Sequence, residues 1–252
     1  MIGKTIGFGF ATARNIIARG LVRIGVTPNM LSVLGMLLMV CAGVCYALGA
    51  SHNNAFLPLA GVFIVLSSAS DILDGAVARI GGKASDFGAF LDSTLDRFSD
   101  FAIYAGIAIS FAWQNPANMT YILLAMVAFL SSFMISYTRA RAENLIPDCS
   151  TGFWQRGERT AAIVIATFAG NIPAMLIQQA WLPMMTALGR VMHTKAVIAG
   201  KAKPDRKSWF TKIQIWRARR MTVGYDISCM ICVAWLIFVR FDAVDYIRQW
   251  LN

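Results

Sequence analysis

Two short stretches decide the fold of this chain: Asp71-Ile-Leu-Asp74-Gly75-Ala-Val-Ala78-Arg79 and, after eight residues, Gly88-Ala-Phe-Leu-Asp92-Ser-Thr-Leu-Asp96. Both stretches belong to long apolar segments. A carboxylate is costly in hydrocarbon, so an acid within a membrane segment marks a functional site by default. We therefore expect these four aspartates to carry the chemistry of the protein.

The composition around them is that of an all-α integral membrane protein. The chain has 252 residues, of which 57% are hydrophobic and 14% are charged, whereas a soluble domain usually carries about 25% charged residues. The net charge is +10. We assign this charge to cytosolic loops and to contact with anionic membrane lipids, and expect no nucleic-acid partner.

Seven apolar segments are predicted, at about residues 30–50, 55–80, 87–113, 117–141, 157–171, 174–194 and 221–240. The links at 51–54, 114–118 and 170–173 contain no lysine or arginine, whereas the links between them are basic. Positive loops stay on the cytosolic side. The sequence therefore predicts a multi-pass protein of the cell membrane, with its N-terminus and its acids at the cytosolic boundary.

Three regions follow from this pattern. Residues 1–28 place Phe10, Ala13, Ile17 and Leu21 at helical spacing, which predicts an interfacial helix on the cytosolic surface. Residues 29–196 hold the first six apolar segments and form the predicted catalytic bundle. Residues 197–252 are predicted to be a basic linker followed by an extra, seventh apolar helix.

The spacing of the acids brings them together. Asp71 and Asp74 share one helical stripe with Gly75, and Asp92 and Asp96 share a stripe on the next helix. A short turn with Gly81-Gly82 joins the two helices, which must then run antiparallel. All four carboxylates are expected to converge near the cytosolic end of the bundle.

Four converging carboxylates need cations. Oxygen ligands suit Mg²⁺ or Mn²⁺, and no set of histidines and cysteines indicates zinc. A divalent ion held by carboxylates typically meets a phosphate-bearing substrate. A buried network of aspartate–arginine pairs that only holds helices together is the structural alternative.

The pattern resembles the signature of the CDP-alcohol phosphotransferase family. Eight fixed positions are present at the matching spacings: Asp71, Asp74, Gly75, Ala78, Arg79, Gly88, Asp92 and Asp96. Thr27-Pro28-Asn29 also resembles the family's start of the catalytic core. The resemblance covers about residues 10–195 and implies a six-helix bundle, to which the C-terminal segment is an addition.

The resemblance implies a reaction in which a CDP-linked lipid donates a phosphatidyl group to an alcohol and CMP is released. It implies that Asp71, Asp74, Asp92 and Asp96 hold two divalent ions, and that Asp96 is also the general base. The implied CDP-binding residues are Asp71, Asp74, Gly75, Ala78, Arg79, Pro28 and Asn29. Exchanged roles for Asp92 and Asp96 stay open. The family also implies a homodimer.

A set of arginines at the same depth bears on the acceptor. Arg139 and Arg141 end the fourth segment, and Arg156 and Arg159 form an i, i+3 pair at the start of the fifth. Guanidinium groups suit a phosphate. The stretch Ser-Tyr-Thr-Arg139-Ala-Arg141-Ala-Glu is similar to the family branch that makes phosphatidylinositol phosphate from inositol phosphate. That resemblance implies acceptor-phosphate binding by Arg139, Arg141, Arg159 and Arg190.

Several alternatives remain at this point. The donor is CDP-diacylglycerol or a CDP-linked ether lipid, since archaeal enzymes share much of the pattern. Glycerol 3-phosphate is the alternative acceptor, which would give phosphatidylglycerophosphate. A divalent-cation transporter and a catalytically idle scaffold are the alternatives from other classes.

Overall fold

A computed structural model describes residues 2–49, 55–149, 152–201 and 223–239, and these residues form eight helices. The helices are α1 (Ile2–Arg23), α2 (Pro28–Gly49), α3 (Phe56–Ile80), α4 (Asp86–Ala112), α5 (Met119–Glu143), α6 (Arg156–Ala169), α7 (Ile172–Ile198) and α8 (Val223–Phe238). The predicted all-helical fold is confirmed. Most of the predicted basic linker, residues 202–222, lies outside the described residues.

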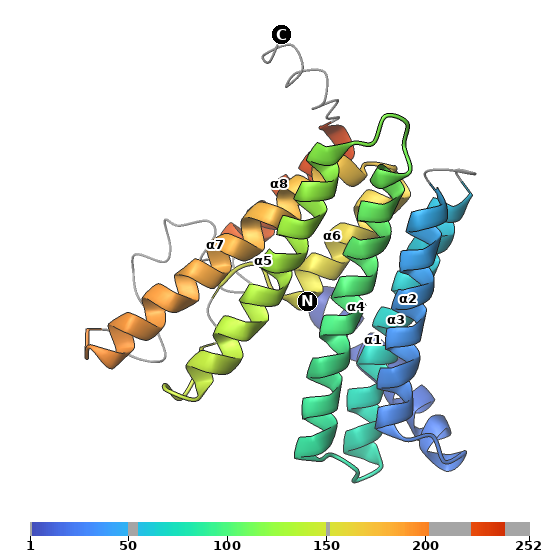
Figure 1. The fold of residues 1–252 in the computed structure, drawn as a ribbon. Helices are drawn as coiled ribbons and strands as arrows, with labels where there is room; N and C mark the ends of the chain where they lie inside the picture. Colours follow the sequence, from blue (N-terminus) through green and yellow to red (C-terminus); the bar gives the residue numbers. More distant parts are fainter. Residues whose placement is uncertain (1, 50–54, 150–151, 202–222, 240–252) are drawn as a thin grey trace.

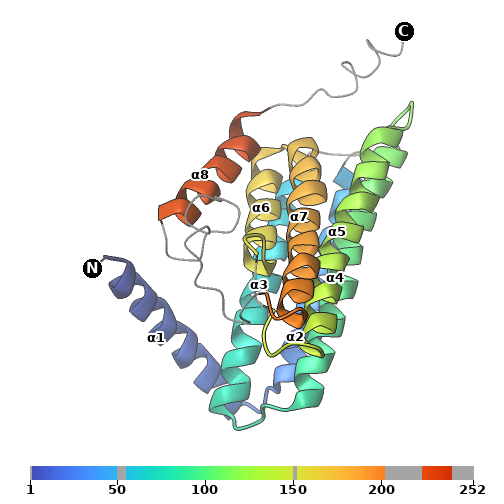
Figure 2. The same cartoon turned by 90° about the vertical axis from the view of Figure 1, so that its left-hand side faces the viewer.

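Helices α2 to α7 run up and down alongside one another (Figure 1). The turns from α1 to α2 and from α3 to α4 lie at one end of the bundle, and the link from α4 to α5 lies at the other. Helix α1 leans away from the bundle at the first of these ends (Figure 2). There Ala18 of α1 packs with Leu31, Ala76 and Val77. Helix α1 is thus held against the start of α2 and the end of α3.

Two glycines let α2 and α4 approach closely. A Cβ atom on Gly43 would lie 2.3 Å from the carbonyl oxygen of Ala102, and one on Gly106 would lie 2.0 Å from that of Gly43. Small residues at such crossings give membrane helices their van der Waals contact. This close packing holds the C-terminal half of α2 against α4.

Polar contacts also join helices that are not consecutive in the sequence. The Ser131 hydroxyl of α5 donates to the carbonyl of Ala180 in α7 at 2.8 Å. The hydroxyls of Tyr46 and Thr167 form a hydrogen bond between α2 and α6. Such bonds satisfy groups that would otherwise be buried unpaired in an apolar interior.

The described helices include three that are long and apolar enough to cross a membrane, namely α2, α3 and α5. Their outer faces expose large apolar side chains such as Leu37, Val65 and Leu130. These features are those of an integral membrane protein. Helix α4 carries too many charges to meet the same criterion, and α6 has only 14 residues. The crossing of the membrane by six helices therefore stays a prediction.

Candidate active site

The turn between α3 and α4 sets the geometry of the site. Gly81 closes α3 by donating to the Val77 carbonyl at 2.8 Å, and Gly82 adopts a positive φ of 61°. Ser85 is the N-cap residue just before α4, and its side chain accepts a hydrogen bond from the Gly88 amide at 3.1 Å. A short link thus joins two antiparallel helices, and the acids near the end of α3 face those near the start of α4.

Three of the predicted metal ligands form a cluster. Asp71, Asp74 and Asp92 each offer a carboxylate oxygen, and these oxygens lie within 4.8 Å of one another. Asp74 is buried, at 9% exposure, and its Oδ2 accepts a hydrogen bond from the Ser32 hydroxyl of α2 at 2.8 Å. A hard divalent cation fits this set of oxygens.

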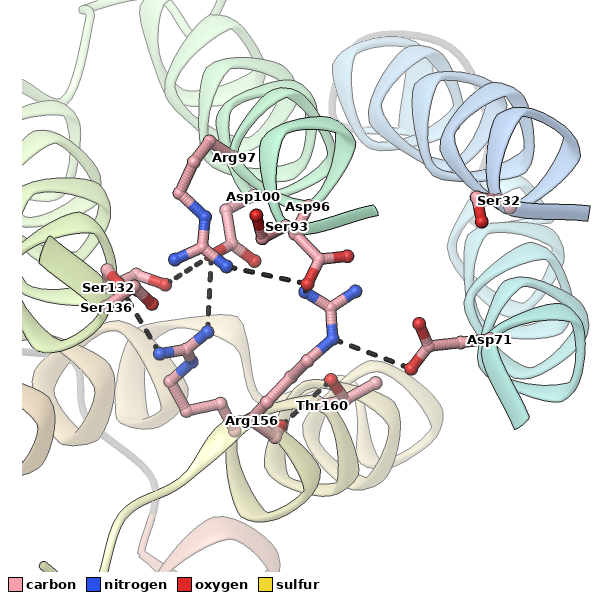
Figure 3. A network of polar contacts seen from close by, with 12 residues as sticks. Ser32, Asp71, Ser93, Asp96, Arg97, Asp100, Ser132, Ser136, Arg156 and Thr160 are labelled. Atoms are coloured by element: carbon pink, nitrogen blue, oxygen red, sulfur yellow. Dashed lines mark hydrogen bonds and ion pairs between the residues drawn. The ribbon is translucent and has the colours of Figure 1, made fainter. Parts of the chain in front are cut away.

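Asp96 lies one helical turn beyond Asp92 and meets α6 (Figure 3). Its carboxylate forms an ion pair with Arg156, the first residue of α6. The same guanidinium lies 3.7 Å from Asp71 Oδ2, so Arg156 bridges the acids of α3 and α4. Arg97 Nη2 lies 3.6 Å from Asp96 Oδ2, the same oxygen that Arg156 contacts. Asp96 is therefore flanked by two guanidinium groups.

A small cavity opens among these groups. Its lining comprises Leu31, Ser32, Gly35, Met36, Ser67, Asp71, Asp74, Asp92, Leu95, Asp96, Ser99 and Arg156. The three clustered aspartates, Asp96 and Arg156 therefore line the same cavity. Arg97 Nε and Nη1 are buried close by without a hydrogen-bond partner among the described residues. These N–H groups and Arg156 provide positive charge next to the acids.

A second polar network lies deeper in the bundle and involves Asp100, one turn beyond Asp96. Its Oδ2 accepts a hydrogen bond from the Ser132 hydroxyl of α5 at 2.8 Å and lies 3.3 Å from Arg159 Nη2. Arg159 is 4% exposed and also donates to the Ser132 carbonyl at 3.4 Å. The Gln179 side chain donates to the Arg159 carbonyl at 3.1 Å. This network ties together α4, α5, α6 and α7.

The predicted acceptor arginines therefore have different surroundings. Arg159 belongs to the deeper network. Arg190 is 4% exposed and donates to the Ile135 carbonyl of α5. Arg139 pairs with Glu143 on its own helix at 2.8 Å, and Arg141 is exposed beside it. The structure does not gather all four around the acid cluster, and their binding of the acceptor phosphate stays a prediction.

The predicted CDP-binding residues lie around the acid cluster on α2 and α3. Arg79 is exposed, and its side chain folds back over Gly75. A Cβ atom on that glycine would lie 3.4 Å from Arg79 Nη1. Ala78 is half-buried on the same helix, and Pro28 opens α2. Asn29 Oδ1 would lie 3.4 Å from a Cβ atom on Gly88. The two glycines thus leave room where α2, α3 and α4 meet.

Two polar residues around the site, Asp100 and Ser32, had no role assigned from the sequence, and Arg156 was left out of the predicted acceptor-binding residues. Asp100 continues the i, i+4 stripe of Asp92 and Asp96, so extending that stripe by one turn would have found it. Arg156 was recognised as the partner of Arg159 in an i, i+3 pair, but the phosphate role was given to Arg159. Ser32 carries no sequence signal, because only the packing of α2 on α3 brings it to Asp74.

The comparisons with known proteins show the family to which the chain belongs. The chain matches the CDP-alcohol phosphatidyltransferase family over residues 25–201. It is 36% identical over 182 residues to the archaetidylinositol phosphate synthase of Pyrococcus horikoshii, covering 71% of this chain and 89% of that protein. It is also 36% identical over 160 residues to the phosphatidylinositol phosphate synthase of Cutibacterium acnes, covering 63% and 73% of the two chains.

Solved structures show the same fold. The phosphatidylinositol phosphate synthase of Mycobacterium tuberculosis with CDP-DAG bound superposes with a TM-score of 0.62 at 27% identity, covering 77% of this chain and 98% of that one. A structure of that protein with manganese and citrate gives a TM-score of 0.61, covering 77% and 93%. The family match spans more than half of the chain and includes the acid cluster. It confirms the resemblance drawn from the eight signature positions and gives no support to a transporter. The chain therefore belongs to the CDP-alcohol phosphatidyltransferase family and is an enzyme of that class.

Proposed function

We propose that this enzyme transfers a phosphatidyl-type group from a CDP-linked lipid to inositol phosphate, giving phosphatidylinositol phosphate or its ether-lipid counterpart and CMP. The observation that carries the proposal is the bridge made by Arg156 between the acids of α3 and α4. A guanidinium group, which suits a phosphate, thus lies beside a carboxylate cluster that suits divalent cations. The names of the relatives support the same acceptor. They include both ester-lipid and ether-lipid enzymes, so the donor is CDP-diacylglycerol or its ether analogue.

Asp71, Asp74 and Asp92 are the proposed metal ligands, with Asp96 next to them. Mg²⁺ or Mn²⁺, as two ions, fits a set of hard carboxylate oxygens. When bound, the metal would neutralise the pyrophosphate and stabilise negative charge on the departing CMP. Ser32 orients Asp74 through its hydroxyl, which supports the carboxylate as a ligand.

Asp96 is the proposed general base. A hydroxyl oxygen of the acceptor attacks the lipid-bearing phosphorus of the donor, and the bond from that phosphorus to the oxygen of CMP breaks. The hydroxyl proton passes to the Asp96 carboxylate as the new bond forms. A positioned carboxylate of this kind typically contributes a factor of about 10² to 10⁴ in rate.

The donor and acceptor are proposed to approach from different sides. Gly75, Ala78 and Arg79 of α3, with Pro28 and Asn29 of α2, would take the cytidine diphosphate. Arg156 joins the proposed acceptor-phosphate residues because it already lies at the acids. The remaining members of that set are Arg139, Arg141, Arg159 and Arg190.

We further propose how the chain lies in the membrane. Residues 1–28 lie on the cytosolic surface as an interfacial helix, residues 29–196 form a six-span bundle, and residues 197–252 add a basic linker and α8. The alternating charge of the links supports an active site that faces the cytosol. A homodimer is the proposed assembly.

An acceptor competition tests the proposed function. Purified protein with CDP-diacylglycerol and Mg²⁺ is offered inositol phosphate and glycerol 3-phosphate separately, and release of CMP is measured. We expect release that depends on inositol phosphate and exceeds that with glycerol 3-phosphate by at least about tenfold in kcat/KM. Release with glycerol 3-phosphate alone would overturn the assignment of the acceptor. Repeating the assay with a CDP-linked ether lipid identifies the preferred donor.

A further inference from the structure

Helix α8 follows the part of the chain that matches the family, which ends at residue 201. It lies against α6 in the bundle (Figure 2). Tyr225 near its start contacts Glu158 near the start of α6, and Leu236 near its end contacts Asn171 after the end of α6. Helix α8 therefore runs in the same direction as α6 and contacts it near both of its ends.

Specific polar bonds hold α8 in this register. The buried Asn171 side chain donates to the carbonyls of Leu236 at 2.9 Å and Val239 at 2.7 Å. The Trp235 indole N–H donates to the Ala174 carbonyl of α7 at 3.1 Å, and the Gln178 amide donates to the Cys232 carbonyl at 3.3 Å. A helix that packed only through apolar contact would not need these bonds.

The start of α8 contacts the first turn of α6. Glu158 Oε2 accepts a hydrogen bond from the Gln155 amide at 3.2 Å, which completes a capping box at the start of α6. Glu158 Oε1 accepts a hydrogen bond from the Tyr225 hydroxyl. The Tyr225 ring also packs edge-on against Phe153, with ring centroids 5.2 Å apart. Tyr225 thus holds the carboxylate that caps α6.

That capped turn carries the arginine that reaches the acids. Arg156 begins α6 and bridges Asp71 and Asp96, and Arg159 one turn later pairs with Asp100. A shift of the first turn would move both guanidinium groups relative to α4. A displacement of about 1 Å in a catalytic arrangement is enough to cost about 10²-fold in rate.

We propose that α8 braces the catalytic bundle from the C-terminal side and that Tyr225 is a positioning residue for the acceptor-binding end of α6. It acts through Glu158 and touches neither substrate. This inference rests on the proposed function, because its kinetic effect is read through the acceptor. It assigns a role to the segment that the chain has beyond its family match.

The test compares Tyr225→Phe with Trp235→Phe in the full chain. Each removes one hydrogen-bond donor of α8, the first near the site and the second at the far end of the helix. For Tyr225→Phe we expect the KM for inositol phosphate to rise about five- to tenfold, a factor within the range that the net loss of one typical hydrogen bond gives. The KM for CDP-diacylglycerol should stay unchanged. Trp235→Phe should leave both KM values unchanged. An unchanged acceptor KM in Tyr225→Phe, or an equal rise in both variants, would overturn the proposal.

A second measurement separates this inference from the proposed function. Hydrogen–deuterium exchange of residues 155–160 should be faster in Tyr225→Phe than in the unmodified chain and unaffected in Trp235→Phe. If the unmodified chain does not use inositol phosphate, the proposed function fails, and the exchange data still decide whether α8 holds the first turn of α6. Equal exchange in all three proteins would contradict the proposal that α8 holds the first turn of α6 through Tyr225.

Discussion

The two ends of the acid stripe on α4 have opposite surroundings. Asp92 faces Asp71 and Asp74 across a small cavity, and Arg156 at 3.7 Å from Asp71 is the cation that reaches this cluster. Asp100, two turns further along α4, receives a hydrogen bond from Ser132 and pairs with a buried arginine. The carboxylates of Asp71, Asp74, Asp92 and Asp96 outnumber the two arginines beside them, Arg97 and Arg156, and such an excess at a cavity indicates a ligand site. One carboxylate paired with one buried arginine instead indicates a link between helices. The difference separates residues that serve the reaction from residues that hold the bundle.

The largest expected effect comes from the acid between these two ends. Asp96→Asn should lower the rate of acceptor-dependent CMP release by about 10³-fold, because the amide does not accept the hydroxyl proton. Binding of the CDP-lipid, measured with labelled donor in detergent, should stay within about twofold of the unmodified chain. Asp86→Asn is the matched control, since Asp86 is exposed in the first turn of α4. Near-full turnover by Asp96→Asn would reject this residue as the base.

The paired end of the stripe should respond in stability. Asp100→Asn leaves the guanidinium of Arg159 buried beside a neutral group, and we expect the free energy of unfolding to fall by about 3 kcal/mol. Thermal unfolding in detergent micelles measures the loss, with Asp86→Asn again as the control. The Mg²⁺ concentration for half-maximal activity should not change. If Asp100→Asn had normal stability and needed more Mg²⁺, Asp100 would belong to the ligand site. The two ends of the acid stripe would then not differ in role.

A smaller effect is expected at the support of the cluster. Ser32→Ala removes the hydroxyl that donates to Asp74 at 2.8 Å. Loss of such a support typically weakens a metal site by about tenfold or more. We therefore expect about a tenfold rise in the Mg²⁺ concentration needed for half-maximal activity. At saturating Mg²⁺ the variant should be nearly as active as the unmodified chain. Ser68→Ala is the control, because Ser68 donates only within its own helix, to the Ile64 carbonyl. Equal metal requirements for Ser32→Ala and Ser68→Ala would contradict the role of Ser32.

The smallest effect is expected at the exposed arginines. Arg141→Ala should raise the KM for inositol phosphate about threefold and leave the KM for the donor unchanged, because an exposed guanidinium contributes little to phosphate binding. Arg156→Ala should raise the KM for inositol phosphate more than Arg141→Ala does, since Arg156 contacts the acids of the site. A larger effect of Arg141→Ala than of Arg156→Ala would show that the acceptor binds further from the acid cluster.

The sequence predicted one side of the comparison much better than the other. Helical spacing brings Asp71, Asp74 and Asp92 together once the turn at Gly81-Gly82 is recognised, so the cluster follows from two neighbouring helices. The pairing of Asp100 with Arg159 depends on α6, which is separated from α4 by a whole helix in the sequence and meets it only through tertiary packing. Helical periodicity alone cannot show which of two arginines on α6 faces the cavity.

The helices themselves were predicted closely, because apolar segments in membrane proteins are long and their links are polar. The predicted segment at 87–113 is α4, and the one at 157–171 is α6. The contacts of α8 were not predictable, since they depend on single side chains such as Asn171 that bond to backbone carbonyls of another helix. The resemblance to the family likewise gave no information on this helix, which lies beyond the matched residues.

Binding of Mn²⁺ to three proteins tests the central claim most directly. Electron paramagnetic resonance titrations would compare the unmodified chain with Asp74→Asn and Asp100→Asn, each in the same detergent. We expect Asp74→Asn to bind Mn²⁺ at least about tenfold more weakly than the unmodified chain, because the cluster loses a charged ligand. Asp100→Asn should bind it as the unmodified chain does. Equal binding by all three proteins, or weaker binding by Asp100→Asn alone, would contradict the assignment of the Asp71, Asp74 and Asp92 cluster as the metal site.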